Sequence, residues 1–261
     1  LTHNKLSEYM KVMVQISRIS ENITNDELYF KAKKDFLENI GIFEQISKFT
    51  VFSLLYSYTI TQINIRRTEF NIELYDLLKL IIRHNAYMKS GNEYMPSMLF
   101  REFILTALKQ NDIAGAEKFI KEYTEILAPE NKETMLNFSK GKINMHQKNF
   151  LNTLAFYDKC PKNIQILNLD MKIDKLVCLF ELGYFDKCRN EISRNKMIIK
   201  NNKTITEYQR ESFKTYIDIM ERLMDLKFKP DIKTKLKLIK DTEKKKILHY
   251  KDWILKQARK I

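Results

Sequence analysis

The sequence predicts an all-α fold: a right-handed α-solenoid of stacked antiparallel helical hairpins, closed by a C-terminal capping helix unit. Hydrophobic residues make up 44% of the 261 residues, which is enough to bury a core. The 5 Gly and 4 Pro are too few for the frequent turns of an all-β fold. Stacking is predicted by a third observation, because one pattern of residue types recurs along the chain at a near-constant interval.

The recurring pattern occupies three windows, "LKQNDIAGAEKFIKEY", "MHQKNFLNTLAFYDKC" and "FELGYFDKCRNEISRN", which begin at residues 108, 145 and 180. In each window the first, sixth and thirteenth columns are large and apolar, and the ninth is small. A small side chain lets two antiparallel helices approach closely, and the large neighbours then close over the contact. The first column holds Leu108, Met145 and Phe180, and the sixth holds Ile113, Phe150 and Phe185. The ninth column holds Ala116, Thr153 and Cys188, and the thirteenth holds Ile120, Tyr157 and Ile192.

On these residues, the stretch 96–195 resembles tetratricopeptide repeats. The family features are the turn "KQND" at 109–112, "ELGYFDKC" at 181–188, Gly141 at the small site of a first helix, and Pro129 after a second helix. Ile104 and Thr153 depart from the family, which prefers small residues there. Neighbouring helical-hairpin families remain open. Together these patterns predict three hairpins over residues 96–200, between an N-terminal region (1–95) and a C-terminal region (201–261) of one continuous array.

The N-terminal region is predicted to hold two divergent hairpins. A capping box of Thr24 and Glu27 is expected to open a helix that Gly41 ends. Residues 70–84 carry apolar side chains on one helical face, namely Ile72, Tyr75, Leu78 and Ile82. Residues 49–65 contain no charge, but seven of the 17 are Ser, Thr, Gln or Asn, which favours a buried helix over a membrane span.

The C-terminal region is predicted to begin with a long helix that a capping box of Thr204 and Glu207 opens and that ends before Pro230. Two helices follow, and they are expected to close the array by covering the apolar face of its last repeat. The residues at helical spacing in these two helices are Ile232, Leu236 and Ile239, then Ile247, Tyr250, Ile254 and Ala258.

The net charge of +13 is concentrated at the C-terminal end, because residues 227–261 contain 13 Lys and Arg against four acidic residues. Such a block predicts an anionic partner, although an AT-rich genome would also produce many Lys and Asn codons. The basic tail could hold a nucleic-acid backbone, with Tyr250 and Trp253 available for stacking on bases. Its cations are Lys244, Lys245, Lys246, Lys251, Lys256 and Arg259.

No catalytic or metal-binding motif stands out. The five glycines are isolated, neither H-E-x-x-H nor G-x-S-x-G occurs, and the three cysteines form no C-x-x-C pair. Cys160 and Cys188 fall on the packing side of second helices, where burial is expected. We therefore expect no enzyme activity, no cofactor, no metal, no membrane span and a cytoplasmic location.

The resemblance to tetratricopeptide repeats implies a concave face, lined by the first helix of each hairpin, that binds a partner protein or peptide. Its mixture of apolar and cationic residues suits a peptide with apolar and acidic side chains. The residues it points to are Arg101, Leu105, Lys109, Phe138, Lys142, Met145, His146, Ile173, Asp174 and Val177. We expect no clamp for a chaperone's C-terminal carboxylate, because Leu105 and Ser139 replace the expected Asn residues and Asp170 and Asp174 replace cations. The sequence thus favours an interaction scaffold, with nucleic-acid binding as the alternative.

Overall fold

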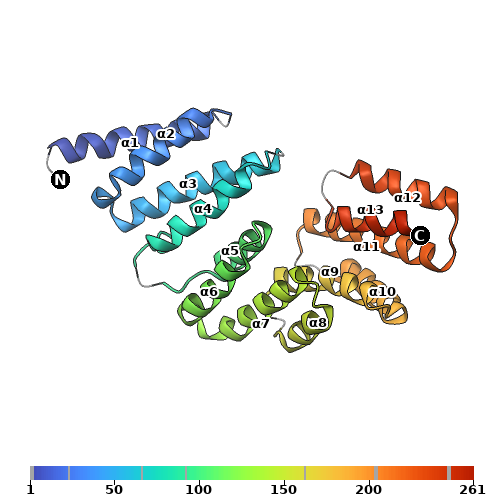
Figure 1. The fold of residues 1–261 in the computed structure, drawn as a ribbon. Coiled ribbons are helices and arrows are strands. Elements are labelled where there is room, and N and C mark those ends of the chain that lie inside the picture. Colours follow the sequence, from blue (N-terminus) through green and yellow to red (C-terminus); the bar gives the residue numbers. More distant parts are fainter. Residues whose placement is uncertain are drawn as a thin grey trace. The chain divides into compact units, whose positions relative to one another are not determined.

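The computed structural model describes residues 3–22, 24–65, 67–91, 93–161, 163–202, 205–245 and 248–261. Over these ranges the protein is all-α, with thirteen α-helices, two short 3-10 helices and no β-strand (Figure 1). The chain divides into two compact units, Leu1–Met135 (unit 1) and Leu136–Ile261 (unit 2). The boundary falls inside one helix, within the stretch where three hairpins are predicted.

Unit 1 is built from consecutive helix pairs. Helices α1 and α2, α3 and α4, and α5 and α6 pack together in turn, and α1 also packs on α3 and α4 on α5. Aromatic side chains fill its core, with Tyr29, Phe36, Phe52 and Phe100 buried completely or almost completely. The elements are α1 (His3–Glu21), α2 (Asp26–Glu38), η1 (Ile40–Ile42), α3 (Gln45–Asn64), α4 (Phe70–Arg83), α5 (Ser97–Lys109), α6 (Ile113–Tyr123), η2 (Thr124–Ile126) and the first part of α7 (Pro129–His146).

The charge-free stretch 49–65 lies mostly in α3, which packs among its neighbours as predicted. Val51, Phe52, Leu55 and Tyr58 are buried there, and the hydroxyl of buried Thr59 donates to the carbonyl of Leu55. No helix in the described ranges has the length and apolar character needed to cross a bilayer.

Unit 2 contains the rest of α7 and six further helices. Each helix from α8 to α13 packs on the next one along the chain, and α11 also contacts α9 and α13 (Figure 1). Its core centres on α11, where Tyr216, Ile217, Met220 and Leu223 are fully buried. The elements are α8 (Phe150–Lys159), α9 (Gln165–Glu181), α10 (Phe185–Asn201), α11 (Glu207–Phe228), α12 (Ile232–Lys244) and α13 (Lys251–Lys260).

One turn geometry recurs in the three sequence windows. Asn111, Lys148 and Gly183 occupy the same column, and each has a positive φ, of 58°, 62° and 73°. The next backbone N–H donates to the carbonyl five residues earlier in all three turns, at 2.9, 2.8 and 2.9 Å. This is the Schellman ending of a helix. The following helices, α6, α8 and α10, all begin two residues after the positive-φ residue.

The packing columns agree with this alignment. Ala116, Thr153 and Cys188, the small residues of the ninth column, are all fully buried. Gly141 on α7 lies against the ring of Tyr157 on α8, so that a Cβ at Gly141 would overlap the ring. The recurrence in the sequence therefore corresponds to a recurrence of turn and contact.

Several predicted helix ends are wrong by a few residues. Helix α2 is capped by Asn25, whose side chain accepts from the N–H of Leu28, and not by Thr24. It ends at Glu38, and Gly41 lies in η1. Helix α11 is opened by a capping box of Thr206 and Gln209, and Thr204 lies outside the described residues. At both helix starts, a polar residue one or two positions after the predicted cap accepts the hydrogen bond from the N–H three residues later.

Three apolar residues predicted to face a core are exposed. Ile72 on α4 has a relative exposure of 60%, although Tyr75, Leu78 and Ile82 are buried as predicted. Ile232 and Leu236 on α12 are exposed as well, because Leu238 and Thr242, on the other side of this helix, face α11 and α13. Ile254 and Ala258 are buried as expected, and Ile247 lies outside the described residues.

Candidate functional site in unit 2

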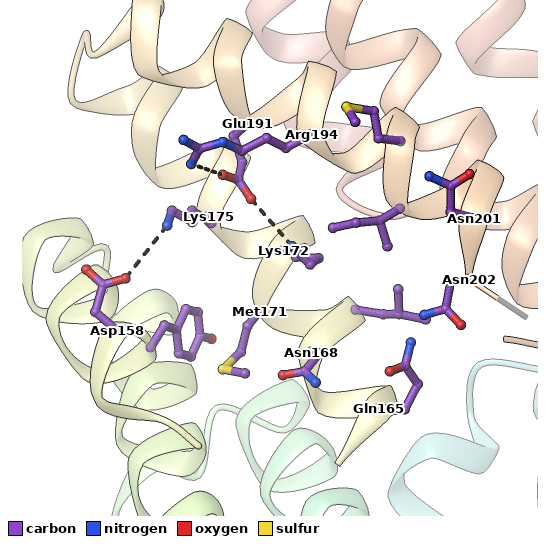
Figure 2. A pocket seen from close by; sticks show the side chains of 14 residues that line it. Asp158, Gln165, Asn168, Met171, Lys172, Lys175, Glu191, Arg194, Asn201 and Asn202 are labelled. Carbon is purple, nitrogen blue, oxygen red and sulfur yellow. Dashed lines mark ion pairs between the residues drawn. The ribbon is translucent and has the colours of Figure 1, made fainter. Parts of the chain in front are cut away.

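A cavity of about 840 Å³ opens in unit 2 where α8, α9 and α10 meet (Figure 2). Its volume falls within the range typical of ligand-binding clefts. Helix α9 supplies one wall, the C-terminal half of α10 another, and the end of α8 contributes two residues. The lining residues are Tyr157, Asp158, Gln165, Asn168, Leu169, Met171, Lys172, Lys175, Glu191, Arg194, Met197, Ile198, Asn201 and Asn202.

The charged residues of the cavity form three ion pairs, drawn in Figure 2. Lys172 lies 3.6 Å and Arg194 3.8 Å from Glu191, and Lys175 lies 3.7 Å from Asp158. These distances exceed the 2.7–2.9 Å of a close charge-assisted hydrogen bond. Three cations against two carboxylates leave the lining with an excess positive charge, and Lys175 and Arg194 are held at distances that a closer anion can compete with.

The remaining lining is made of carboxamides, aliphatic and methionine side chains and the ring of Tyr157. Gln165, Asn168, Asn201 and Asn202 supply groups that both donate and accept hydrogen bonds. Met197, at 65% exposure, presents an open apolar surface at the rim. The cavity thus combines polar, cationic and apolar contacts.

Sequence reasoning missed this cavity, although a signal was present. Gln165, Asn168, Lys172 and Lys175 recur at intervals of three, four and three residues, which places polar side chains along one face of α9. Most of the other residues of α9 are buried, whereas these four are partly exposed, so this face borders the solvent. The two asparagines that complete the lining, at the end of α10, follow no comparable pattern.

A buried carboxylate lies behind the cavity wall. Asp174 on α9 is 1% exposed and pairs with the ammonium of Lys142 on α7 at 2.7 Å. The hydroxyl groups of Tyr157 on α8 and Tyr250, just before α13, donate to its two oxygens at 2.5 and 2.7 Å. Because Tyr157 also lines the cavity, its hydrogen bond to Asp174 holds this part of the cavity wall in position.

The groups around Asp174 hold their protons. Burial and the adjacent carboxylate raise the pKa of Tyr157 and of Tyr250 well above the usual phenol value. Burial, with the same carboxylate, raises the pKa of the Cys178 thiol to about 12. None of these groups is prepared to act as a base or nucleophile near neutral pH, and the cluster is best understood as a structural tie between four segments.

Most of the predicted groove residues in unit 2 pack inside it. Phe138, Met145, Ile173, Asp174 and Val177 have exposures of 9% or less, whereas His146 is exposed. The C-terminal segment contributes to this burial, since Tyr250 and Trp253 pack against Met145, Val177 and Cys178. The C-terminal segment thus covers part of the predicted groove.

The other predicted groove residues lie on α5 in unit 1. Arg101 forms an ion pair with Glu102 at 3.6 Å, and Leu105 is partly buried. Lys109 is exposed, and its ammonium donates to the side chain of Asn71 at 2.7 Å. The two cations among these residues are thus engaged by other side chains of unit 1.

The basic tail is divided between paired and unpaired cations. Arg259 pairs with Glu243 at 3.0 Å, and Lys251 donates to the carbonyls of Glu243 and Lys245. Lys244, Lys245 and Lys256 are exposed, and Lys246 lies outside the described residues. Trp253 packs edge-on against Phe180, and its indole N–H donates to Glu181 at 2.5 Å.

The part of the chain that the structure describes contains no group of three or more His, Cys, Asp or Glu side chains able to hold a metal ion. Cys160, Cys178 and Cys188 are free thiols and buried. Comparison of the chain with protein-family models, curated proteins and solved structures gives no match.

Proposed function

We propose that this chain is a non-catalytic interaction protein, and that the cavity of unit 2 binds an extended, acidic segment of a partner protein. The observation that carries the proposal is the lining itself: carboxamides, loosely paired cations and an exposed methionine around about 840 Å³. A TPR-like α-solenoid is part of the proposal, supported by the shared turns of the three hairpins. A cytoplasmic location is proposed as well, supported by the three free cysteines.

The carboxamides favour a peptide over a small apolar ligand. An Asn or Gln side chain presents one acceptor and two donors, so it can pair with both the N–H and the C=O of an extended backbone. The side chains of Gln165 and Asn201 make no hydrogen bond within the described residues and are available for this pairing. The backbone N–H and C=O groups of a bound peptide lose their hydrogen bonds with water, and the side-chain carboxamides of the lining can replace those bonds.

The charges favour acidic side chains in that peptide. Lys175 and Arg194 are held at 3.7 and 3.8 Å from their carboxylates, so that a closer anion can compete for them. An aliphatic side chain of the peptide would cover Met197, whose polarizable, flexible side chain adapts to different shapes. The expected ligand is thus a segment with acidic residues beside an aliphatic one.

Nucleic-acid binding has less support from the geometry. The two aromatic residues that would stack on bases are engaged inside unit 2, since Tyr250 binds Asp174 and Trp253 packs on Phe180. The exposed lysines remain as its only support, and they are considered separately below.

The proposal is tested by selecting random peptides from a displayed library on the purified full-length protein. The enriched peptides are synthesised with a fluorophore, and their affinity is measured by fluorescence anisotropy. We expect enrichment of acidic residues next to aliphatic ones. The variant K175E/R194E reverses two of the cavity charges and is expected to weaken binding at least about tenfold, because each close charge pair is worth on the order of 1 kcal/mol or more.

The matched control is K118E/K121E, which makes the same charge change on the exposed face of α6 in unit 1. It is expected to bind the peptides as the unaltered protein does. Failure to enrich any peptide would refute the proposal. So would peptides whose affinity falls equally in both variants, because net charge and not the cavity would then determine binding.

A further inference from the structure

Helix α12 carries a row of lysines on its outer surface. Lys233, Lys237, Lys240 and Lys244 are all exposed, at intervals of four, three and four residues, so they follow one face of the helix. None of the four forms an ion pair within the described residues. These cations are therefore not required by the fold of unit 2.

An apolar edge runs beside the lysines. Ile232 is 75% and Leu236 62% exposed, and they lie one helical turn apart. The core contact of α12 is made by Leu238 and Thr242, which are fully buried, and by Ile239, which is partly buried. The exposed apolar residues are thus additional to those that hold the helix in place.

We propose that this outer face of α12 binds the surface of an anionic lipid bilayer. The lysines would lie at the level of the acidic headgroups, and Ile232 and Leu236 would enter the boundary between headgroups and acyl chains. Basic residues on one side of a helix and exposed aliphatic residues along its edge are the arrangement of helices that lie in a membrane interface. The proposal is independent of the peptide site, which lies on α8, α9 and α10.

The apolar edge decides between a membrane and a nucleic acid as the anionic partner. A phosphate backbone attracts the lysines equally well, but it offers no apolar layer that would cover Ile232 and Leu236. An anionic bilayer stabilises both the lysines and the aliphatic residues, because its headgroups attract cations and its interior buries aliphatic side chains. The sequence pattern predicted that these two residues are buried, so it did not indicate an exposed apolar surface beside the lysines.

The test measures co-sedimentation of the full-length protein with vesicles of phosphatidylcholine, with or without phosphatidylserine, at roughly 0.15 M ionic strength, where surface charges still interact over a Debye length. We expect binding to the phosphatidylserine vesicles and little to phosphatidylcholine alone. The variant K233S/K237S is expected to bind about 25-fold more weakly, since each lysine near an anionic surface contributes about a fivefold change in affinity.

The second variant, I232S/L236S, keeps all charges and is expected to weaken vesicle binding about tenfold through the loss of buried aliphatic surface. K118S/K121S on α6 matches the charge change of the lysine variant and is expected to bind normally. All substituted side chains are exposed or on an outer face, and circular dichroism melting is expected to show that the variants fold like the unaltered protein.

The proposal is overturned if phosphatidylserine vesicles are not bound, or if I232S/L236S binds them with unchanged affinity. It is also overturned if duplex DNA or RNA, but not vesicles, is bound in a manner that the lysine variant abolishes. In that case the face of α12 would be a site for phosphate backbones.

Discussion

The buried carboxylate of Asp174 is expected to be among the most sensitive positions of unit 2. In the variant D174N the ammonium of Lys142, whose side chain is 12% exposed, loses the one carboxylate that pairs with it among the described residues. Removing one partner of a buried pair costs about 3–5 kcal/mol. Because the carboxamide oxygen of Asn can still accept from one tyrosine, we expect the lower end of that range, about 3 kcal/mol.

The effect can be followed in unit 2 alone. Trp253 is the single tryptophan of the chain, and it packs on Phe180 close to the Asp174 cluster. Its fluorescence during urea unfolding therefore reports the free energy of unfolding of this unit. A loss of about 3 kcal/mol corresponds to a melting temperature lower by about 10 °C for a unit of this size.

A double variant tests the mechanism. K142M/D174N removes the unpaired ammonium, and we expect it to recover about 1–2 kcal/mol relative to D174N alone. The control D158N breaks the exposed pair with Lys175 and is expected to change stability by no more than about 0.5 kcal/mol. The reasoning is refuted if D174N unfolds like the unaltered protein. It is also refuted if the loss of unfolding free energy in K142M/D174N equals the sum of the losses in K142M and in D174N.

Three further outcomes are expected, each measured as a change in the urea or thermal unfolding of unit 2. The variant G141A is expected to lose about 1–3 kcal/mol, because its Cβ would overlap the ring of Tyr157; wild-type stability would show that the two helices can separate without cost. At the shared turn position, K148G is expected to raise the free energy of unfolding by up to about 1 kcal/mol and G183A to lower it by about as much, since both positions have positive φ. If both substitutions stabilised the protein, or both destabilised it, the shared turn would be contradicted. The pKa values of Tyr157 and Tyr250 are raised in the folded state, so their contribution is complete below the unfolded tyrosine value of about 10 and is lost as pH rises above it. Thermal unfolding should accordingly show a melting temperature that is level from neutral pH to about pH 9 and falls above about pH 10, less steeply in Y250F; a melting temperature that is constant through this range would contradict the assignment.

The local architecture followed closely from the residues. The first, ninth and thirteenth columns of the three windows are buried, whereas the large residues of the sixth column are only partly buried. The turn residues Asn111, Lys148 and Gly183 adopt one geometry. Such features depend on contacts between residues close in the sequence, where spacing determines position. The prolines behave likewise, because Pro129 begins α7 and Pro230 follows the end of α11.

The site was less accessible to sequence reasoning because it depends on distant contacts. Tyr250 meets Asp174 across 76 residues, and nothing in the spacing of either residue indicates the pair. On α12, Leu236 and Leu238 are two residues apart and face opposite sides of the helix. Only packing against α11 and α13 decides which of them is buried, so the helical pattern alone assigned the wrong one to the core.

The central claim is that a peptide occupies the cavity between α8, α9 and α10, and the most direct measurement is a photo-crosslink. A photoreactive amino acid is placed at Met197 on the cavity rim and, in a separate protein, at Leu151, an exposed position of α8 outside the lining. A selected acidic peptide is then added and the crosslinked product is mapped by mass spectrometry. We expect crosslinking from Met197 that an excess of unlabelled peptide prevents, and none from Leu151. Crosslinking from Leu151 alone, or from neither position while the peptide remains bound, would contradict the claim.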